Sequence, residues 1–306
     1  RPLSPIPMTE ATDVLDLDDL TAGGLETVLD RAAAIKAGED ENELTRRTLA
    51  MVFEKPSTRT RTSFETAMTR LGGHAIFLGP DDIHLGSGEP VKDTARALAG
   101  YADAIMARLF DHADAEELAE YADVPVINGL TDDAHPCQTL ADLLTVRERF
   151  DGFDDVTVAW VGDGNNVAQS FVLGAALADL DLTVTTPPEY GVDDDVLDRA
   201  AELGRTPRFV DDPGAAVADA DVVYTDVWVS MGEEDVREEK LAAFEGYQVN
   251  ADLLAGNDAL MMHCLPAHRG EEVTDEVVES DRSIVWQQAE NRLHAQAGLL
   301  VELLAE

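Results

Sequence analysis

The sequence contains only two cysteines and four lysines, and aromatic residues make up 6% of its 306 residues. The cysteines, Cys137 and Cys264, are far apart and each lies within two residues of a histidine, which is not the pattern of a disulfide framework. No uninterrupted apolar stretch approaches the roughly 20 residues of a membrane-spanning helix. The segment before Met8 is too short and polar for a secretory signal. We therefore expect a soluble protein of the cytoplasm.

Basic residues are also scarce: 22 lysines and arginines stand against 62 aspartates and glutamates, giving a formal net charge of −40. This charge opposes binding to nucleic acids and to anionic membranes. Hydrophobic residues nevertheless make up 45% of the chain, which is not typical of a disordered protein. We interpret the acidity as a halophilic adaptation, because a Debye length of roughly 3 Å near molar ionic strength screens the self-repulsion of the chain.

The halophilic interpretation predicts that added KCl raises the melting temperature. Screening weakens repulsion between acidic groups most strongly where they are crowded, which is in the folded state. Thermal denaturation in a KCl series measures the effect, with a neutral osmolyte at matched osmolarity as control. A melting temperature that stays constant or falls as KCl is added contradicts the interpretation.

Short apolar runs alternate with helical patterns along the chain. The runs are TLAMVF at 48–53, HAIFL near 74, AIMARLF near 104, VPVIN near 124, VTVAWVG near 156, LTVTT near 182, VVYTDVW near 222, ALMMHCL near 259 and SIVW near 283. Such alternation is typical of parallel sheets with crossover helices. The predicted fold is therefore α/β, with two doubly wound domains whose parallel β-sheets are flanked by helices.

The domain boundary is predicted near residue 147. The helical pattern HPCQTLADLLTVRERF, at 135–150, is followed by the turn-rich stretch FDGFDDV, which indicates a connection between two domains. We predict domains at 1–146 and 147–289 and a final helix at 290–306. That helix is apolar on one face and requires a surface to pack against, but periodicity does not identify the surface.

The run KPSTRTR, at 55–61, lies where an apolar strand gives way to an amphipathic helix. The apolar positions after it recur at helical spacing: Phe64, Ala67, Met68 and Leu71. Ser57 or Thr58 is therefore predicted to cap the helix. Free N–H groups at the helix start, together with Arg59 and Arg61, indicate an anion site suited to phosphate. The alternative is an ordinary cap with two solvated arginines.

Two motifs combine histidine with cysteine. HPCQ, at 135–138, opens the connecting helix, and HCLP, at 263–266, ends a buried strand. A zinc site of two histidines and two cysteines is one interpretation, but the spacing of HPCQ does not match the usual zinc motifs. We also expect His263 and Cys264 to point to opposite faces of an extended strand. The alternative is that both cysteines fill core space.

Two further motifs also follow predicted strands. VAWVGDGNNVAQS, at 158–170, begins like a dinucleotide-binding loop, but Val167 stands where the third glycine is needed. Asn165 and Asn166 are suited to hydrogen-bonding a carboxylate, or to stabilising the turn itself. DVWVSMG, at 226–232, supplies a carboxylate that suits an ammonium group, or one solvated acid among many.

Arg108 and Arg292 are scarce cations in this acidic chain, and the alternative for each is a surface ion pair. Ligands of doubly wound sheets bind beyond the carboxyl ends of the strands. Arg108, like GDGNN, DVWVSMG and HCLP, falls at or just after a predicted strand end. The sequence therefore predicts that function is concentrated at one edge of each sheet.

Taken in order, STRTR, Arg108, HPCQ, GDGNN, D-x-x-x-SMG and HCLP closely resemble the ornithine carbamoyltransferase family over essentially the whole chain. STRTR and HPxQ recur across transcarbamylases, whereas SMG and HCLP resemble the ornithine branch. The resemblance implies transfer of the carbamoyl group of carbamoyl phosphate to the δ-amine of L-ornithine, giving citrulline and phosphate without metal or organic cofactor. It also implies a homotrimer, or a multiple of trimers, with active sites at subunit interfaces.

Two alternatives remain beside this resemblance. The first is a related transcarbamylase acting on another amine, such as putrescine or a modified ornithine; SMG and Asp226, which suit an α-amino acid, argue against it. The second is an acidic ligand-binding protein with a degenerate site, against which the intact STRTR motif argues.

The resemblance implies two sets of binding residues. Domain 1–146, with the final helix packed back onto it, is expected to bind carbamoyl phosphate. The carbamoyl phosphate set comprises Ser57, Thr58, Arg59, Thr60, His84, Arg108, His135, Gln138, Cys264, Leu265 and Arg292. The ornithine set, expected in domain 147–289, comprises Asn165, Asn166, Asp226, Ser230 and Met231. The residues implied to be catalytic are Arg108, His135, Cys264 and Asp226. His84 stands where the family often has a glutamine that reaches a neighbouring subunit.

Overall fold

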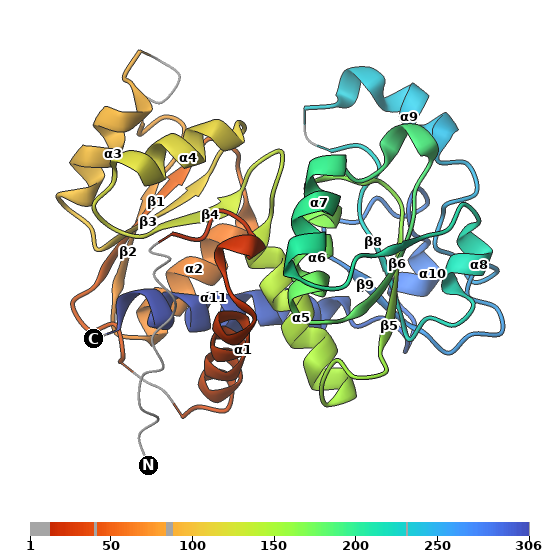
Figure 1. Cartoon of the computed structure of the whole chain (residues 1–306). Helices are drawn as coiled ribbons and strands as arrows, with labels where there is room; N and C mark the ends of the chain where they lie inside the picture. Colours follow the sequence, from red (N-terminus) through yellow and green to blue (C-terminus); the bar gives the residue numbers. More distant parts are fainter. Residues whose placement is uncertain (1–12, 40–41, 84–87, 231, 306) are drawn as a thin grey trace. The chain divides into compact units, whose positions relative to one another are not determined.

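The computed structural model describes residues 13–39, 42–83, 88–230 and 232–305 (Figure 1). The chain divides into two compact units, one formed by residues 1–140 with 292–306 and the other by residues 141–291. The predicted boundary near 147 falls on the same helix as this division, α5 (Pro136–Phe150). Among the described residues, no helix is both long and apolar enough to cross a membrane.

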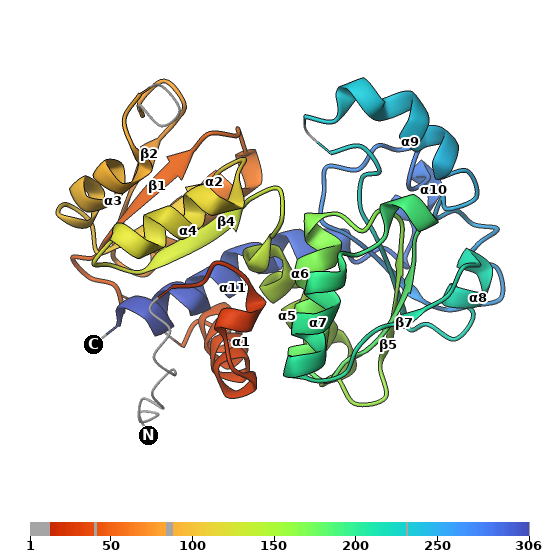
Figure 2. The same ribbon diagram turned by 45° about the horizontal axis from the view of Figure 1, so that its top comes forward.

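The first unit is built on a four-stranded parallel sheet in the order β2-β1-β3-β4. Its strands are β1 (Thr48–Phe53), β2 (His74–Leu78), β3 (Ala104–Arg108) and β4 (Val126–Leu130). Its helices are η1 (Leu17–Asp19), α1 (Ala22–Lys36), α2 (Thr58–Arg70), α3 (Val91–Ala99), α4 (His112–Tyr121), the start of α5 and most of α11 (Val285–Leu304). Helices α3 and α4 cover one face of the sheet, and α1, α2 and α11 lie on the other (Figures 1 and 2).

Side-chain alternation explains how β1 supports both layers. Ala50 and Val52 belong to the core beneath α3 and α4, whereas Leu49, Met51 and Phe53 are buried on the opposite face, as the period of two in a strand requires. The parallel register pairs Phe53 with Arg108. The residues after β1 and the side chain of Arg108 therefore lie at the same edge of the sheet.

The second unit is built on a five-stranded parallel sheet in the order β7-β6-β5-β8-β9. Its strands are β5 (Thr157–Val161), β6 (Asp181–Thr185), β7 (Arg208–Phe209), β8 (Val222–Thr225) and β9 (Leu260–His263). Its helices are the remainder of α5 and the start of α11, with α6 (Asn166–Leu177), η2 (Pro188–Tyr190), α7 (Asp194–Leu203), α8 (Pro213–Val217), η3 (Glu234–Val236), α9 (Arg237–Ala243) and α10 (Asp275–Val278). Helices α6 and α7 lie on one side of this sheet, and α8 and α10 on the other (Figures 1 and 2).

The predicted α/β class with parallel sheets is confirmed, and two details of the strand prediction are wrong. The run SIVW forms no strand: Ser283 makes only an isolated bridge with Met261, because α11 begins at Val285. The sequence analysis also missed β7, a two-residue edge strand whose Arg208 and Phe209 are both exposed. A strand this short shows no periodicity to detect.

Candidate active site

The helix start predicted to bind an anion is capped as expected. Helix α2 begins at Thr58, and the Ser57 hydroxyl accepts a hydrogen bond from the Thr60 N–H at 3.2 Å. Arg59 is exposed at this helix start. Arg61 is engaged elsewhere, with its guanidinium 3.6 Å from the Phe77 ring centroid and hydrogen-bonded to Glu65 at 3.0 Å. Of the two arginines in the motif, Arg59 is therefore the candidate anion ligand.

Arg292, on α11, organises neighbouring side chains in the first unit. It is only 3% exposed, and its guanidinium donates to the Gln138 amide oxygen at 2.8 Å and to the Thr60 hydroxyl at 3.2 Å. The third nitrogen, Nε, donates to Gln296 at 3.1 Å. The fork of donors thus fixes two residues of the predicted carbamoyl phosphate set from a helix distant in the sequence.

His135 is buried at this place, with 5% of its surface exposed. Burial first, and then the positive charges of three arginines, hold the pKa of His135 well below its usual range. The three are Arg292, Arg108 and Arg59. The imidazole is therefore neutral near pH 7, beside a concentration of positive charge that suits a phosphate dianion.

We call the group formed by Arg59, Thr60, His135, Gln138 and Arg292 the first half-site. Cys137 is not part of this group. It is completely buried, its thiol donates to the Asn128 carbonyl at 3.4 Å, and burial raises the pKa of the thiol to about 12. The interpretation of Cys137 as a core residue is confirmed. In the part of the chain that the structure describes, neither cluster of potential metal ligands includes His135 or Cys137.

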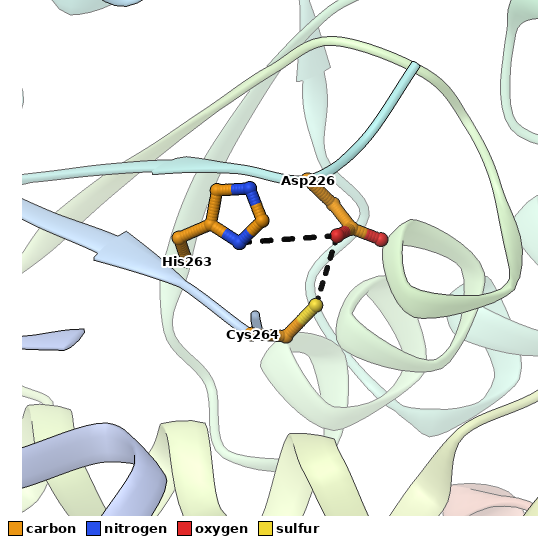
Figure 3. Close-up of side chains that lie close together, drawn as sticks. All are labelled: Asp226, His263 and Cys264. Atoms are coloured by element: carbon orange, nitrogen blue, oxygen red, sulfur yellow. Dashed lines mark hydrogen bonds and ion pairs between the residues drawn. The ribbon is translucent and has the colours of Figure 1, made fainter. Parts of the chain in front are cut away.

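In the second unit, side chains from the ends of β8 and β9 meet at Asp226. Figure 3 shows the Cys264 thiol and the His263 ring both directed at this carboxylate. The thiol donates to Asp226 Oδ1 at 2.9 Å, and His263 Nδ1 lies 4.0 Å from the same oxygen. The expectation that His263 and Cys264 point to opposite faces is therefore wrong. Strand β9 ends at His263 and the backbone turns, with Leu265 at a φ of 61°, so strand alternation no longer applies.

The GDGNN turn supports Asp226 as well as its own helix. The Asn165 side-chain oxygen caps α6 by accepting from the N–H groups of Val167 and Ala168, at 3.0 and 3.1 Å. Its NH2 group donates to Asp226 Oδ2 at 2.9 Å. The turn-stabilising interpretation thus holds for Asn165. Gly164 is needed for packing, because a Cβ there would lie 2.4 Å from the Gly191 backbone.

The His263 ring contacts Glu272, a residue that the sequence analysis missed. Its Nε2 lies 3.0 Å from Glu272 Oε1, and the Leu265 N–H donates to Nδ1 at 2.9 Å. The neutral tautomer with the proton on Nε2 satisfies both contacts. Glu272 is completely buried. One glutamate among many acidic residues gives no sequence signal that would identify it.

Lys240, also missed, connects the SMG segment to the GDGNN turn. Lys240 is 5% exposed, and its ammonium group donates to Asp163 and Glu233 at 2.7 Å each. Glu233 also accepts from the Ser230 N–H at 2.8 Å. Burial, partly opposed by Lys240, raises the pKa of Asp163 to about 6. The scarcity of lysine is the one sequence feature that could have drawn attention to Lys240.

The structure places the remaining predicted residues as follows. Thr58 is the first residue of α2 and Asn166 the first of α6. Cys264 and Leu265, which the resemblance assigned to carbamoyl phosphate, lie in the second unit beside Asp226. His84 and Met231 lie outside the described residues.

Comparison with known proteins identifies the class. The family model of the aspartate/ornithine carbamoyltransferase carbamoyl-P binding domain matches residues 12–148, and that of the Asp/Orn binding domain matches residues 154–303. The ornithine carbamoyltransferase of Haloquadratum walsbyi is 69% identical over 299 residues, which cover 98% of this chain and 100% of the relative. That of Methanoculleus marisnigri is 53% identical, over 96% of this chain and 97% of the relative.

A solved structure agrees with this result. The ornithine carbamoyltransferase of Pyrococcus furiosus is similar with a TM-score of 0.91 and 50% identity, covering 98% of this chain and 99% of that one. These matches identify a two-domain carbamoyltransferase, and the chain has the corresponding two α/β units, each with a parallel sheet. The chain belongs to the aspartate/ornithine carbamoyltransferase family, and its relatives place it in the ornithine branch. The resemblance predicted from the motifs is confirmed.

Proposed function

We propose that the two half-sites divide the two substrates between them. The chain has ornithine carbamoyltransferase activity, converting ornithine and carbamoyl phosphate to citrulline. The observation that carries the division is the contrast in charge: three guanidinium groups act on His135 in the first unit, whereas Asp226 is the acceptor at the centre of the second. A phosphate dianion fits the first environment and an ammonium group fits the second.

In the first half-site, the start of α2 and the side chains of Arg59 and Arg108 bind the phosphate. Paired guanidinium donors match phosphate oxygens, and the helix start adds backbone N–H groups. His135 and Thr60 donate to the carbonyl oxygen of the carbamoyl group, and Gln138 binds its NH2 group. The role of Arg292 is to hold Gln138 and Thr60 in place through its two hydrogen bonds.

In the second half-site, Asp226 and the Ser230–Met231 segment surround the α-amino group of ornithine. Asn166, at the start of α6, binds the α-carboxylate, where the helix N-terminus also favours an anion. Cys264 and Leu265 line the reacting centre. The contacts of Cys264, His263 and Glu272 around Asp226 keep these groups pre-oriented before the substrate arrives.

The reaction then follows from the chemistry of these groups. The neutral δ-amine of ornithine attacks the carbonyl carbon and forms a C–N bond, and the negative charge that develops on oxygen is stabilised by Arg108, His135 and Thr60. The C–O bond to phosphate breaks, phosphate leaves, and the nitrogen loses a proton to give citrulline. Carbamoyl phosphate binds first and ornithine follows, the order that the family resemblance implies.

The assembly and cellular location belong to the same proposal. The enzyme is a homotrimer, or a multiple of trimers, in the cytoplasm. The support is the family resemblance and the two-cysteine composition.

The substrate division predicts that Arg59→Ala raises the KM for carbamoyl phosphate about tenfold to a hundredfold, the usual effect of losing a charge-assisted hydrogen bond. The ornithine KM and kcat change little. Steady-state kinetics with each substrate varied in turn measure both. Arg61→Ala is the matched control, because Arg61 is committed to Phe77 and Glu65. Equal effects of the two substitutions on the carbamoyl phosphate KM would refute the assignment.

Lys240→Met is expected to raise the ornithine KM about tenfold, because loss of two charge-assisted hydrogen bonds releases the segment that carries Ser230. Lys240→Arg restores most of the affinity.

In the parent, Asp163 gains a proton as the pH falls through about 6. Protonation weakens the ion pair of Asp163 with Lys240, so the ornithine KM is expected to rise below this pH. Kinetics from pH 5 to 8 test this; an unchanged KM in Lys240→Met contradicts it.

A further inference from the structure

A second group of potential metal ligands lies just beyond the HCLP turn. His268, Glu271 and Glu272 each offer one ligand atom, and these atoms lie within 4.8 Å of one another. The group is separate from Asp226, His263 and Cys264, which form the other such cluster among the described residues. Nothing in the transfer reaction uses His268 or Glu271.

In each carboxylate of this group, Oε1 already accepts a hydrogen bond, and among the described residues none is found to Oε2. Glu272 Oε1 lies 3.0 Å from His263 Nε2 and accepts from the His268 N–H at 2.6 Å. Glu271 Oε1 accepts from Arg237. Metal-binding carboxylates are typically oriented by partners on one oxygen in this way, which leaves the second oxygen directed at the ion.

Two individual atoms of the group are buried without a hydrogen-bond partner in the described structure, although the His268 side chain as a whole is 40% exposed. Glu272 is 0% exposed, yet its Oε2 has no hydrogen-bond partner there, and neither has His268 Nδ1. His268 Nδ1 lies 3.8 Å from Glu271 Oε2, too far for a hydrogen bond between them. A buried carboxylate oxygen without a partner is costly, and a cation removes that cost.

We propose that His268, Glu271 and Glu272 bind a divalent transition-metal ion. One imidazole nitrogen and two carboxylate oxygens suit Zn²⁺ and the ions that replace it, such as Co²⁺. Arg237 and His263 are the outer partners that orient the two glutamates. The ion stabilises the turn after β9 and takes no part in carbamoyl transfer.

The site has a route to solvent. Glu271 lines a cavity of about 530 Å³, together with Gln248, Gly270 and Glu245. The Gln248 side chain donates to the carbonyl oxygens of Gly270 and Glu271, at 3.0 and 2.8 Å, and so holds the shape of this wall. Glu272 belongs to the proposed metal site and also contacts His263. It therefore connects the proposed ion to the ornithine half-site.

The test is a titration of the full chain, freed of metal and kept in high KCl, with Co²⁺ followed by absorption and Zn²⁺ followed by calorimetry. One ion is expected to bind without a thiolate-to-cobalt charge-transfer band. His268→Ala and Glu271→Gln each weaken binding at least about tenfold. Glu245→Gln is the matched control: it removes the same charge from the same cavity wall outside the cluster, and it leaves the affinity unchanged.

A Cys264→Ser background separates the two clusters, since the proposed ion remains bound when the thiol is absent. Melting temperatures in a chelator check that the variants fold. The proposal is overturned if His268→Ala and Glu271→Gln bind Co²⁺ as tightly as Glu245→Gln does. It is also overturned if the bound ion shows a thiolate band and is lost in Cys264→Ser, because the ion then lies at the other cluster.

Discussion

Replacing His135 with alanine lowers kcat about 10²- to 10³-fold, while the KM for carbamoyl phosphate changes little. In the proposed mechanism His135 donates to the oxygen on which charge develops during attack, and a preorganised donor of this kind acts mainly in the transition state. Removal of one such donor typically costs a factor of this size in turnover. The measurement is the steady-state rate of citrulline formation at saturating concentrations of both substrates.

The pH profile gives this prediction a second, independent readout. Because burial and three arginines hold the pKa of His135 well below its usual range, the ring stays neutral throughout pH 6 to 8. The pH profile of the parent kcat is therefore expected to contain no titration step between pH 6 and 8 that is due to His135. His135→Asn, which keeps an N–H donor, recovers part of the rate. Unchanged turnover in His135→Ala would remove the assigned role.

Asp226→Asn lowers kcat/KM for ornithine about 10²- to 10³-fold. The substitution keeps the shape of the side chain but removes the charge that favours an ammonium group, and loss of one partner of a buried charge pair costs about 3–5 kcal/mol. It also replaces one acceptor oxygen with a donor, so the contacts with Asn165 and Cys264 cannot both persist. Kinetics with ornithine varied at saturating carbamoyl phosphate measure the loss.

Asp219→Asn is the matched control for this substitution. It makes the same change of charge at an exposed position, and we expect kcat/KM within about twofold of the parent, because surface charges contribute little. The carbamoyl phosphate KM should also stay close to the parental value in Asp226→Asn. A loss equal for both substrates would mean that Asp226 supports the fold of the site and not the binding of ornithine.

The fold was largely predictable because apolar runs and helix patterns repeat clearly. The limits of β1, 48–53, were predicted, and the cap was narrowed to Ser57 or Thr58, since a buried strand followed by a Ser/Thr turn has a strong local pattern. The strand predicted at 283–286 is wrong, because apolar residues at the start of a buried helix resemble a short strand. Periodicity could not distinguish the two.

Most candidate site residues were recognised because they occur in compact motifs, and Arg108 and Arg292 because cations are scarce in this chain. Arg59, His135 and Asp226 lie in such motifs. Glu272 and Lys240 do not, and their contacts with His263 and Asp163 depend on the three-dimensional fold. The error over His263 and Cys264 has the same origin, because the end of a strand cannot be located to one residue from its sequence pattern.

The acidity of the chain and its arginine-rich half-site are related. A net charge of −40 creates a field that repels a dianionic substrate. Arg59, Arg108 and Arg292 oppose this field locally, near His135. Molar salt screens the distant acidic groups over roughly 3 Å and leaves contacts within the half-site largely intact. High salt is therefore compatible with carbamoyl phosphate binding.

The most direct test of this account is the carbamoylation rate of different amines by the purified protein in high KCl with carbamoyl phosphate. L-Ornithine, putrescine and L-aspartate are compared at equal concentrations, with product identified by mass spectrometry. The account predicts citrulline from ornithine, in a one-to-one ratio with released phosphate, and far slower reaction with the other two amines. Faster carbamoylation of putrescine or aspartate, or no citrulline at all, would contradict it.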